Sequence, residues 1–127
     1  MKITTYQFGD IEFDENSIIN FEKGLFGFEN LTKFILLHTD ENVFFWFNSI
    51  DEPEITFPMV NLRMIDDSYP VNDSLEVFGM ATLNPDPLKI TLNMKAPVYI
   101  NQNDKTGYQT ILDKDNFKID YNLFVEE

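Results

Sequence analysis

The chain has 127 residues, no cysteine and a net charge of −13, with 22 acidic residues against nine basic ones. That length fits a single domain over residues 1–127 with a core that needs no cross-links, and the missing thiols exclude a disulfide framework and a thiolate metal site. A field of this sign repels phosphate backbones and attracts basic proteins, so we expect protein partners and no direct binding to nucleic acid.

The first third of the chain predicts a hairpin followed by a tight turn. Residues 2–8 and 11–13 alternate imperfectly between apolar and polar side chains, and Gly9-Asp10 between them offers a turn. Further along, Gly24 and Gly27 bracket apolar residues, a spacing that suits a tight turn with close backbone approach. The elements expected next are one helical turn at residues 29–33 and a strand at residues 34–37.

A run of four aromatic residues, Phe44 to Phe47, lies near the centre of the chain. Each such side chain buries roughly 150–250 Å² when packed, so both faces of the strand that carries them must be covered. Residues 43–47 and 55–60 are separated by poor strand formers and predict a hairpin. In the return strand Pro58 has no N–H for a ladder, which indicates an edge strand or a bulge.

The second half of the chain continues with short apolar runs between polar turns. Residues 63–74 are polar, acidic and interrupted by Pro70, so they predict a loop of about a dozen residues, a length that is often functional in compact domains. The remaining expected elements are a strand at residues 75–83, a rigid turn at 84–87, an alternating strand at 88–94, its continuation at 97–101, a hairpin turn at 103–107 and a strand at 108–112.

Many short strands joined by turns at roughly 8–12-residue spacing predict an all-β, mainly antiparallel fold, either a small barrel or a sandwich, with one or two short helical turns. The chain holds 13 Phe, five Tyr and one Trp. Most of these rings should form the core, and the surplus either lines a ligand cavity or forms an exposed patch for a partner. The tail at residues 113–127 is charged and weakly patterned, and its candidate anchors are Phe117, Ile119, Tyr121 and Phe124.

The sequence shows no signal for export or membrane insertion. Residues 1–16 hold no uninterrupted apolar run of the kind found in secretion signals, and no stretch reaches the ~20 apolar residues of a membrane span. The absence of cysteine mildly favours a reducing compartment. We therefore expect a soluble, cytoplasmic protein.

Three motifs that resemble sites are incomplete. His38 is the sole histidine, so a catalytic triad or a zinc site would lack partners, and we interpret it as a strand-end residue, with an interface role as the alternative. Asp113 begins a stretch like a calcium loop, but Lys118 and Phe124 stand where glycine and glutamate are required. Residues 23–28 resemble an RNA-stacking strand with one residue inserted, which breaks the alternation that stacking needs.

Three carboxylates gather in the turn of the central hairpin, at Asp51, Glu52 and Glu54. Glycosidases hold two carboxylates apart across a fixed gap, whereas residues clustered in a Pro-containing turn should all face water. We interpret this tip as a solvated or partner-facing acidic surface. Two rival functions stay open: a small-ligand-binding barrel, which needs an apolar cavity at its mouth, and a hydrolase, which needs a second carboxylate across a cleft.

Six stretches resemble the flagellar assembly factor family FliW, in the same order along residues 1–112. They are Phe8-Gly9 with an acidic strand after it, residues 21–29 (FEKGLFGFE), 34–37 (FILL), 45–57 (FWFNSIDEPEITF), 91–101 (TLNMKAPVYIN) and 107–112 (GYQTIL). Six colinear blocks are far more specific than any one of them. The chain departs from the family at Phe26, which replaces a proline, at residues 66–75, which are fewer than usual, and at residues 116–124, which replace a closing Y-x-x-x-H-P-L motif.

This resemblance implies a small β-barrel-like cytosolic protein that is not an enzyme and carries no cofactor. Members of the family bind the basic RNA-binding regulator CsrA away from its RNA surface and so prevent it from repressing the flagellin message. They also bind flagellin, and unsecreted flagellin holds the factor away from CsrA. From the resemblance we expect the same two partners here, with the free protein a monomer.

The acidic composition fits such a role, because carboxylates attract and orient a basic partner. Residues 31–80 are the most acidic part of the chain, with nine acidic and two basic side chains. We expect the loop at residues 66–76 to lie beside the acidic hairpin tip, apolar contacts to supply most of the affinity, and flagellin to dock an amphipathic helix in an apolar groove. The candidate partner-binding residues are Asp51, Glu52, Glu54, Asp66, Asp67, Asp73 and Glu76.

Overall fold

Strands make up most of the regular structure in the computed structural model of the chain, which describes residues 1–5, 7–39 and 42–125. The strands are β1 (Lys2–Thr5), β2 (Gly9–Glu12), β3 (Ile19–Asn20), β4 (Lys33–His38), β5 (Phe45–Ser49), β6 (Thr56–Asn61), β7 (Glu76–Thr82), β8 (Thr91–Leu92), β9 (Val98–Asn101), β10 (Thr106–Gln109) and β11 (Tyr121–Asn122). The helical turns are η1 (Glu15–Ser17), α1 (Leu62–Ile65) and η2 (Pro87–Lys89).

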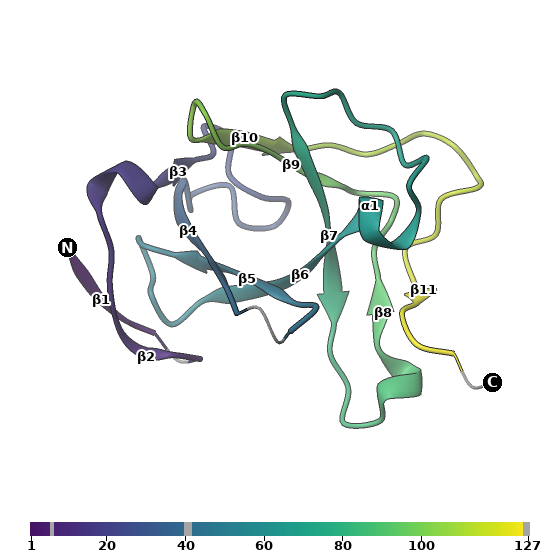
Figure 1. Ribbon diagram of the computed structural model, residues 1–127, viewed down its shortest axis with the longest axis horizontal. Helices are drawn as coiled ribbons and strands as arrows, with labels where there is room; N and C mark the ends of the chain where they lie inside the picture. The colour runs from purple at the N-terminus through teal and green to yellow at the C-terminus, as the bar shows by residue number, and fades with distance from the viewer. Residues whose placement is uncertain (6, 40–41, 126–127) are drawn as a thin grey trace.

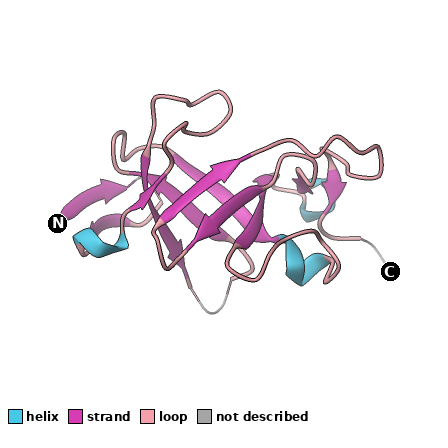
Figure 2. Ribbon diagram, turned by 90° about the horizontal axis from the view of Figure 1, so that it is seen from above, coloured by secondary structure: helices cyan, strands magenta, loops and turns pink. Residues whose placement is uncertain are grey.

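Seven strands close into a barrel in the order β7, β6, β5, β4, β3, β10, β9 and back to β7 (Figure 1). Neighbours in the barrel run antiparallel except β3 and β10, which pair in parallel at Asn20 and Thr106. β8 and β11 continue the sheet beyond the end of β7, and the helical turns lie toward the two ends of the molecule (Figure 2). The predicted all-β, mainly antiparallel fold is confirmed. Of the two predicted architectures, barrel and sandwich, the barrel is the one that forms.

The central hairpin forms as predicted, with β5 returning into β6 and Phe47 opposite Phe57. Phe47 is fully buried inside the barrel, and Trp46 is buried on the other face of β5. There its ring meets Phe8 edge to face, with ring centroids 6.1 Å apart. Both faces of the aromatic strand are therefore covered, as the sequence required.

Pro58 occupies a position where its missing N–H costs no ladder bond. The Ser49 N–H donates to the Ile55 carbonyl. Since hydrogen-bonded pairs alternate along an antiparallel ladder, the pair of Trp46 and Pro58 is a non-hydrogen-bonded one. The pairing of β6 with β7 begins only at Met59. The predicted edge strand is therefore wrong, because β6 lies between β5 and β7, but Pro58 lies on a stretch of β6 that has no partner on the β7 side.

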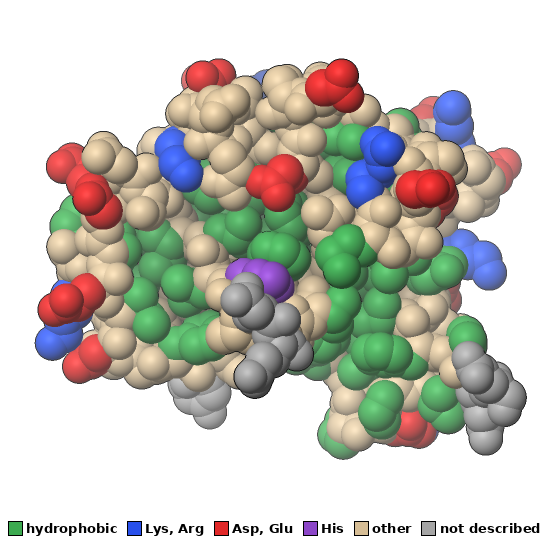
Figure 3. All heavy atoms as spheres, viewed as in Figure 1, with side chains coloured by type: hydrophobic (Ala, Val, Ile, Leu, Met, Phe, Trp, Pro, Cys, Tyr) green, Lys and Arg blue, Asp and Glu red, His purple; other side chains and the backbone are tan. Residues whose placement is uncertain are grey.

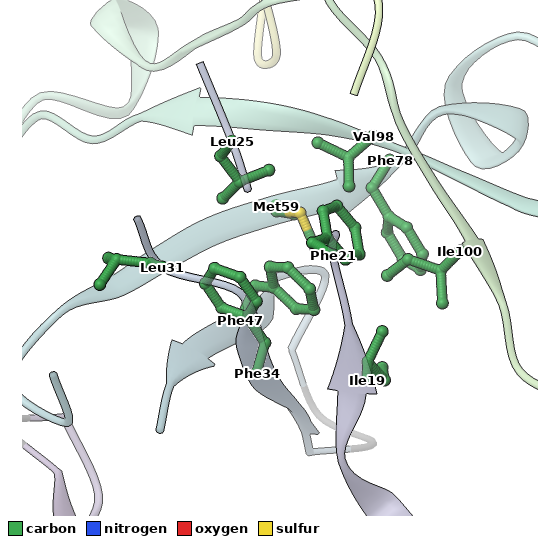
Figure 4. Close-up of a cluster of buried hydrophobic side chains, with 10 residues drawn as sticks. All are labelled: Ile19, Phe21, Leu25, Leu31, Phe34, Phe47, Met59, Phe78, Val98 and Ile100. Atoms are coloured by element: carbon green, nitrogen blue, oxygen red, sulfur yellow. The ribbon is translucent and has the colours of Figure 1, made fainter. Parts of the chain in front are cut away.

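Apolar side chains from all round the wall fill the barrel interior (Figure 4). Phe34 and Phe47 stack with ring centroids 4.3 Å apart, and Phe21 contacts both rings at 5.7 and 5.1 Å. The buried set is Ile19, Phe21, Leu25, Leu31, Phe34, Phe47, Met59, Phe78, Val98 and Ile100. A ligand-binding barrel would hold its ligand in this space, which the chain fills with its own side chains.

A second apolar cluster covers the outer face of β6, β7 and β9. Strand side chains alternate between faces, so Val60, Val77 and Tyr99 point away from the barrel interior that their chain neighbours fill. The full cluster is Val60, Leu62, Tyr69, Val77, Leu92, Met94 and Tyr99. α1, the loop that follows it and the C-terminal segment cover this face (Figure 1).

The opening hairpin, β1 with β2, forms a separate two-stranded sheet. Gly9 pairs with Thr5, so the turn precedes Gly9 and the predicted turn at Gly9-Asp10 is wrong by about two residues. The Thr5 hydroxyl donates to the Gly9 carbonyl and accepts from the Phe8 N–H, both at 2.9 Å, which closes the turn. Tyr6, which belongs to the predicted first strand, lies outside the described residues.

The helical turn predicted at residues 29–33 is wrong. The chain there makes a reverse turn, in which the Leu31 N–H donates to the Phe28 carbonyl, and enters β4 at Lys33. Each helical turn that does form starts after an Asp or Asn whose side chain accepts an N–H of the first turn, and these caps are Asp14, Asn61 and Asp86. Residues 29–33 follow no such cap. None of the helices in residues 1–5, 7–39 and 42–125 is long and apolar enough to cross a membrane.

Three predictions for the second half need correction. The loop expected at residues 63–74 begins with α1, which extends to Ile65. The strand expected at residues 88–94 is reduced to β8, because the Asp86 cap and Pro87 begin η2 and leave Leu88 exposed. Gly107, expected in a hairpin turn, lies inside β10, and Lys105 takes the positive φ of that turn.

The C-terminal segment is anchored at two of the four predicted positions and at one that was not predicted. Phe117 packs on the second cluster, and Tyr121 in β11 pairs with Leu92 in β8. Ile119 and Phe124 are exposed, at 66% and 41%, and Leu123 packs on the cluster instead. This anchoring brings the tail beside α1, far from it in sequence.

Candidate protein-binding surface

The tip of the central hairpin is an ordered acidic turn. Asp51 accepts hydrogen bonds from the backbone N–H groups of Thr32 and Lys33, at 3.0 and 3.2 Å, so its carboxylate ties the tip to the start of β4. Asn48 donates to the Pro53 carbonyl at 3.1 Å and closes the turn from inside. Asp51 is thus used within the fold, whereas the neighbouring carboxylates of Glu52 and Glu54 are exposed.

Residues 66–75, the acidic loop, contain a polar turn at each end. The Asp66 carboxylate accepts from the Ser68 N–H at 3.0 Å and from its hydroxyl at 2.6 Å. Asn72 accepts in the same way from Ser74, at 3.0 and 2.7 Å. The hydrogen bonds from Ser68 hold the pKa of Asp66 below its ordinary value, so this carboxylate stays charged. Within the loop Asp67 and Asp73 are exposed, and Glu76, half-buried, begins β7.

We expect the Asp66 carboxyl to titrate below its ordinary pKa of 3.8. Because the folded-state pKa is the lower one, its hydrogen bonds stabilise the fold above the unfolded-state pKa, and this contribution is lost as the pH falls through the folded-state pKa. Ser68→Ala should therefore raise the titration midpoint of Asp66, measured by carboxyl carbon NMR. Ser74→Ala is the matched control and should leave that midpoint unchanged; a Ser68→Ala midpoint equal to the parent's would contradict the assignment.

Side chains from other parts of the chain hold the middle of the acidic loop. The Tyr69 side chain is buried, and its hydroxyl donates to the Met94 carbonyl. The Tyr99 hydroxyl donates to the Pro70 carbonyl at 3.0 Å, and the Arg63 guanidinium donates to the Tyr69 carbonyl at 3.2 Å. Burial raises the pKa of both phenols, so they remain donors at neutral pH. Hydrogen bonds to α1, to β9 and to the segment of Met94 therefore hold the loop in place.

A partly apolar groove of about 360 Å³ lies between α1 and the tail. This tail groove is lined by Ile65, Asp66, Met94, Asn116, Phe117, Lys118 and Tyr121. Exposed apolar side chains continue from it on both sides, with Met64 on α1 and Ile119 on the tail each about two-thirds exposed. The groove and the acidic loop share Asp66, so a charged and an apolar surface meet there.

The two groups of predicted binding residues do not lie together. The hairpin tip precedes β6, and the acidic loop follows α1 at its other end, so roughly 20 Å of six-residue strand separates them. In Figure 1 the tip lies at the left and the loop at the upper right. The expectation that the loop lies beside the tip is therefore wrong. Asp51, Glu52 and Glu54 form one acidic group, and Asp66, Asp67, Asp73 and Glu76 form another.

Few of these charges are neutralised within the fold. The described residues form one ion pair, between Lys2 and Asp10, with nitrogen and oxygen 3.5 Å apart. On the face shown in Figure 3, acidic side chains lie mostly around the margin and apolar surface lies between them. In residues 1–5, 7–39 and 42–125 no three His, Cys, Asp or Glu side chains gather in a way that could hold a metal ion. Such a surface suits contact with another protein.

The family model for the FliW protein matches residues 2–123. This chain belongs to the FliW family. Flagellar assembly factor FliW of Clostridium botulinum strain Hall is 36% identical over 143 residues, an alignment that covers 100% of this chain and 99% of that protein. FliW of Clostridium tetani is 35% identical over 142 residues, with 100% and 98% covered. A crystal structure of the flagellar assembly factor FliW matches with a TM-score of 0.90 and 28% identity, covering 100% of this chain and 99% of that one.

These alignments are longer than the 127 residues of the chain, so its FliW relatives carry additional residues at one or more places. The shared fold nevertheless extends through the tail, whose sequence departs from the family's closing motif. Reasoning from the sequence missed the tail groove. A partial signal was present, since the aromatic spacing of the tail marked Phe117 and Tyr121, but nothing local joined them to Ile65 and Met94.

Proposed function

We propose that this protein is a cytoplasmic, non-catalytic regulator that sequesters the RNA-binding repressor CsrA away from that protein's RNA surface and is itself bound by flagellin. The observation that carries the proposal is an acidic loop joined to a partly apolar groove, in a member of the family of flagellar assembly factors. A net charge of −13 supports a basic partner such as CsrA.

The acidic loop is the better candidate for CsrA. Its exposed carboxylates are Asp67 and Asp73. The hydrogen bonds of the Tyr69 and Tyr99 hydroxyls anchor the loop between them, so the carboxylates are positioned before binding. At the hairpin tip, Asp51 is already bonded to the backbone of β4. We assign the loop carboxylates the steering and orientation of CsrA, and the adjacent apolar side chains most of the affinity.

The tail groove is the candidate site for flagellin. An amphipathic helix docks its apolar face in a groove of apolar side chains, and Ile65, Phe117 and Tyr121 supply such walls here. Because the groove and the acidic loop share Asp66, two proteins of ordinary size would overlap if they bound both together. We therefore expect flagellin and CsrA to compete for this protein.

The two rival functions have less support. A small-ligand-binding barrel needs its interior free, and the side chains that would line the cavity, Phe21, Phe34 and Phe47 among them, pack on one another. A carboxylate hydrolase built on the hairpin tip needs Asp51 free to react, and that carboxylate is bonded to two backbone N–H groups.

Charge reversal tests the placement of CsrA. We expect Asp67→Lys with Asp73→Lys to lower the association rate constant with CsrA by about tenfold at low ionic strength, because steering depends on local charge. Glu52→Lys with Glu54→Lys changes the net charge by the same amount at the hairpin tip and should have a smaller effect. The association rate constants of both double variants and of the parent protein should fall as salt is added, measured by surface plasmon resonance.

Equal effects of the two double variants would mean that only net charge matters and would remove the loop as the CsrA site. A larger effect at the hairpin tip would move the site there. If the unmodified protein bound neither CsrA nor flagellin, the proposed function itself would be wrong.

A further inference from the structure

We infer that Tyr69 is a positioning residue that joins the acidic loop to the tail groove, so that the two partner surfaces form one mechanically linked unit. The inference rests on the function proposed above. Its starting observation is that a single buried side chain of the loop contacts the groove lining through both its ring and its hydroxyl. It adds to that function a route by which one bound partner affects the other surface.

The hydroxyl of Tyr69 reaches across 25 residues of sequence to the carbonyl of Met94, whose side chain lines the groove. The N–H of Met94 in turn donates to the Lys118 carbonyl at 2.8 Å, and Lys118 also lines the groove. Tyr69 and Lys118 are thus bonded to the two backbone groups of one residue. Movement of the loop at Tyr69 must displace Met94 or break the bond.

The ring of Tyr69 forms the second link. It meets Phe117 edge to face, with centroids 5.3 Å apart, and Phe117 is part of the groove wall. Such contacts between aromatic rings contribute beyond the area they bury and fix the relative orientation of the rings. The tail is also bonded to the rest of the chain by the pairing of β11 with β8, by the Met94 N–H to the Lys118 carbonyl and by the Leu123 N–H to the Ile90 carbonyl. The ring of Tyr69 therefore helps to hold Phe117 in the groove wall.

The loop side of the link is equally direct. The Tyr69 carbonyl accepts from Arg63 on α1, and the next carbonyl, that of Pro70, accepts from Tyr99 on β9. Asp67 lies two residues before Tyr69, and Asp73 lies three residues after Pro70. If Tyr69 only filled the core, a phenylalanine would suffice. What the hydroxyl adds is one hydrogen bond, to the Met94 carbonyl outside the loop.

Tyr69→Phe in the full chain tests the inference, since it keeps the ring and removes the hydroxyl. We expect hydrogen exchange at backbone N–H groups of residues 66–75 and 116–118 to accelerate about tenfold, with β4 and β5 unchanged. Dissociation of purified CsrA should accelerate about three- to tenfold while its association rate constant is unchanged, because no charge changes. Dissociation of flagellin should accelerate as well, although the substitution lies in the loop.

Two further variants keep the outcome unambiguous. Tyr99→Phe removes the bond to Pro70 and leaves the groove lining untouched, so it should loosen the loop and CsrA but not residues 116–118 or flagellin. Tyr108→Phe is the matched control, since its ring stacks on Tyr99 and its hydroxyl has no partner in the described part of the chain; it should change nothing.

Faster exchange confined to the loop in Tyr69→Phe, or faster exchange of both segments with unchanged dissociation of both partners, would overturn the inference and leave the proposed function standing. A lower melting temperature with unchanged dissociation of both partners would also overturn it. If Tyr69→Phe does not fold, an unchanged rate of CsrA dissociation from Tyr99→Phe would also overturn the inference. Absence of binding by the unmodified chain would instead remove the proposed function.

Discussion

Replacement of Phe47 by alanine is expected to lower the free energy of unfolding by about 3–5 kcal/mol. Phe47 is fully buried, stacks on Phe34 and contacts Phe21, so the substitution leaves a cavity at the centre of the barrel. A loss of that size is a large part of the 5–15 kcal/mol that typically stabilises a domain. Urea denaturation followed by the fluorescence of Trp46, the sole tryptophan, would measure it.

Phe26→Ala provides the matched control, because it removes the same atoms from a side chain that is half exposed. Its cost should stay within about 1 kcal/mol. Circular dichroism should give the same midpoint as fluorescence for each variant if unfolding is two-state. Similar losses for the two variants would show that the rings in the barrel are not its main source of stability.

The importance of Phe47 could be predicted from the sequence because its signal is local. Four consecutive aromatic residues followed by turn residues and a second apolar run specify a hairpin covered on both faces, and β5 and β6 form it. The two-residue alternation then decides which side chains face the barrel. Phe47 and Met59 face inward, and Trp46 and Val60 fall on the other face.

The candidate site was less predictable because its parts are joined by non-local contacts. Ile65, Met94 and Phe117 come from three distant segments, and the contacts of Tyr69 and the pairing of β11 with β8 bring them together. No spacing of residues along the chain encodes such contacts. The tail also departs from the family's closing motif, so the resemblance gave no guidance there.

The wrong placement of the acidic loop had a different cause. Glu54 and Asp66 are close in sequence, but the predicted hairpin already placed a full strand between them, and a strand separates its ends by ~3.3 Å per residue. The missed helical turns were also decided locally, by Asx caps at Asn61 and Asp86 that accept N–H groups of the next turn. Both facts were available from the sequence.

Gly107→Ala is expected to destabilise the fold by about 3 kcal/mol or more, through crowding. A Cβ at this position would lie 2.3 Å from a ring carbon of Phe21 and 2.4 Å from the Tyr99 carbonyl oxygen. Phe21 is fully buried and packs against both Phe34 and Phe47, so its ring cannot retreat without moving the core. β10 would have to separate from β9 or from β3, and the barrel closes through these pairs.

Gly79→Ala separates this crowding from the general effect of adding a methyl group to a strand glycine. A Cβ at Gly79 would lie 2.8 Å from the tip of the Leu62 side chain and 3.1 Å from the Asn93 carbonyl oxygen. Leu62 is fully buried too, but the crowded atom is the end of a flexible side chain and the nearest backbone atom is farther away than at Gly107. A smaller loss of about 1 kcal/mol is therefore expected, measured by the same urea titration. In Gly107→Ala, hydrogen exchange of N–H groups in β9 and β10 should rise before that of β4 and β5, because closure fails first where the methyl group lies. Equal losses for the two variants would show that the ring of Phe21 yields as readily as the side chain of Leu62, and the barrel would then be held by strand pairing more than by its packed interior.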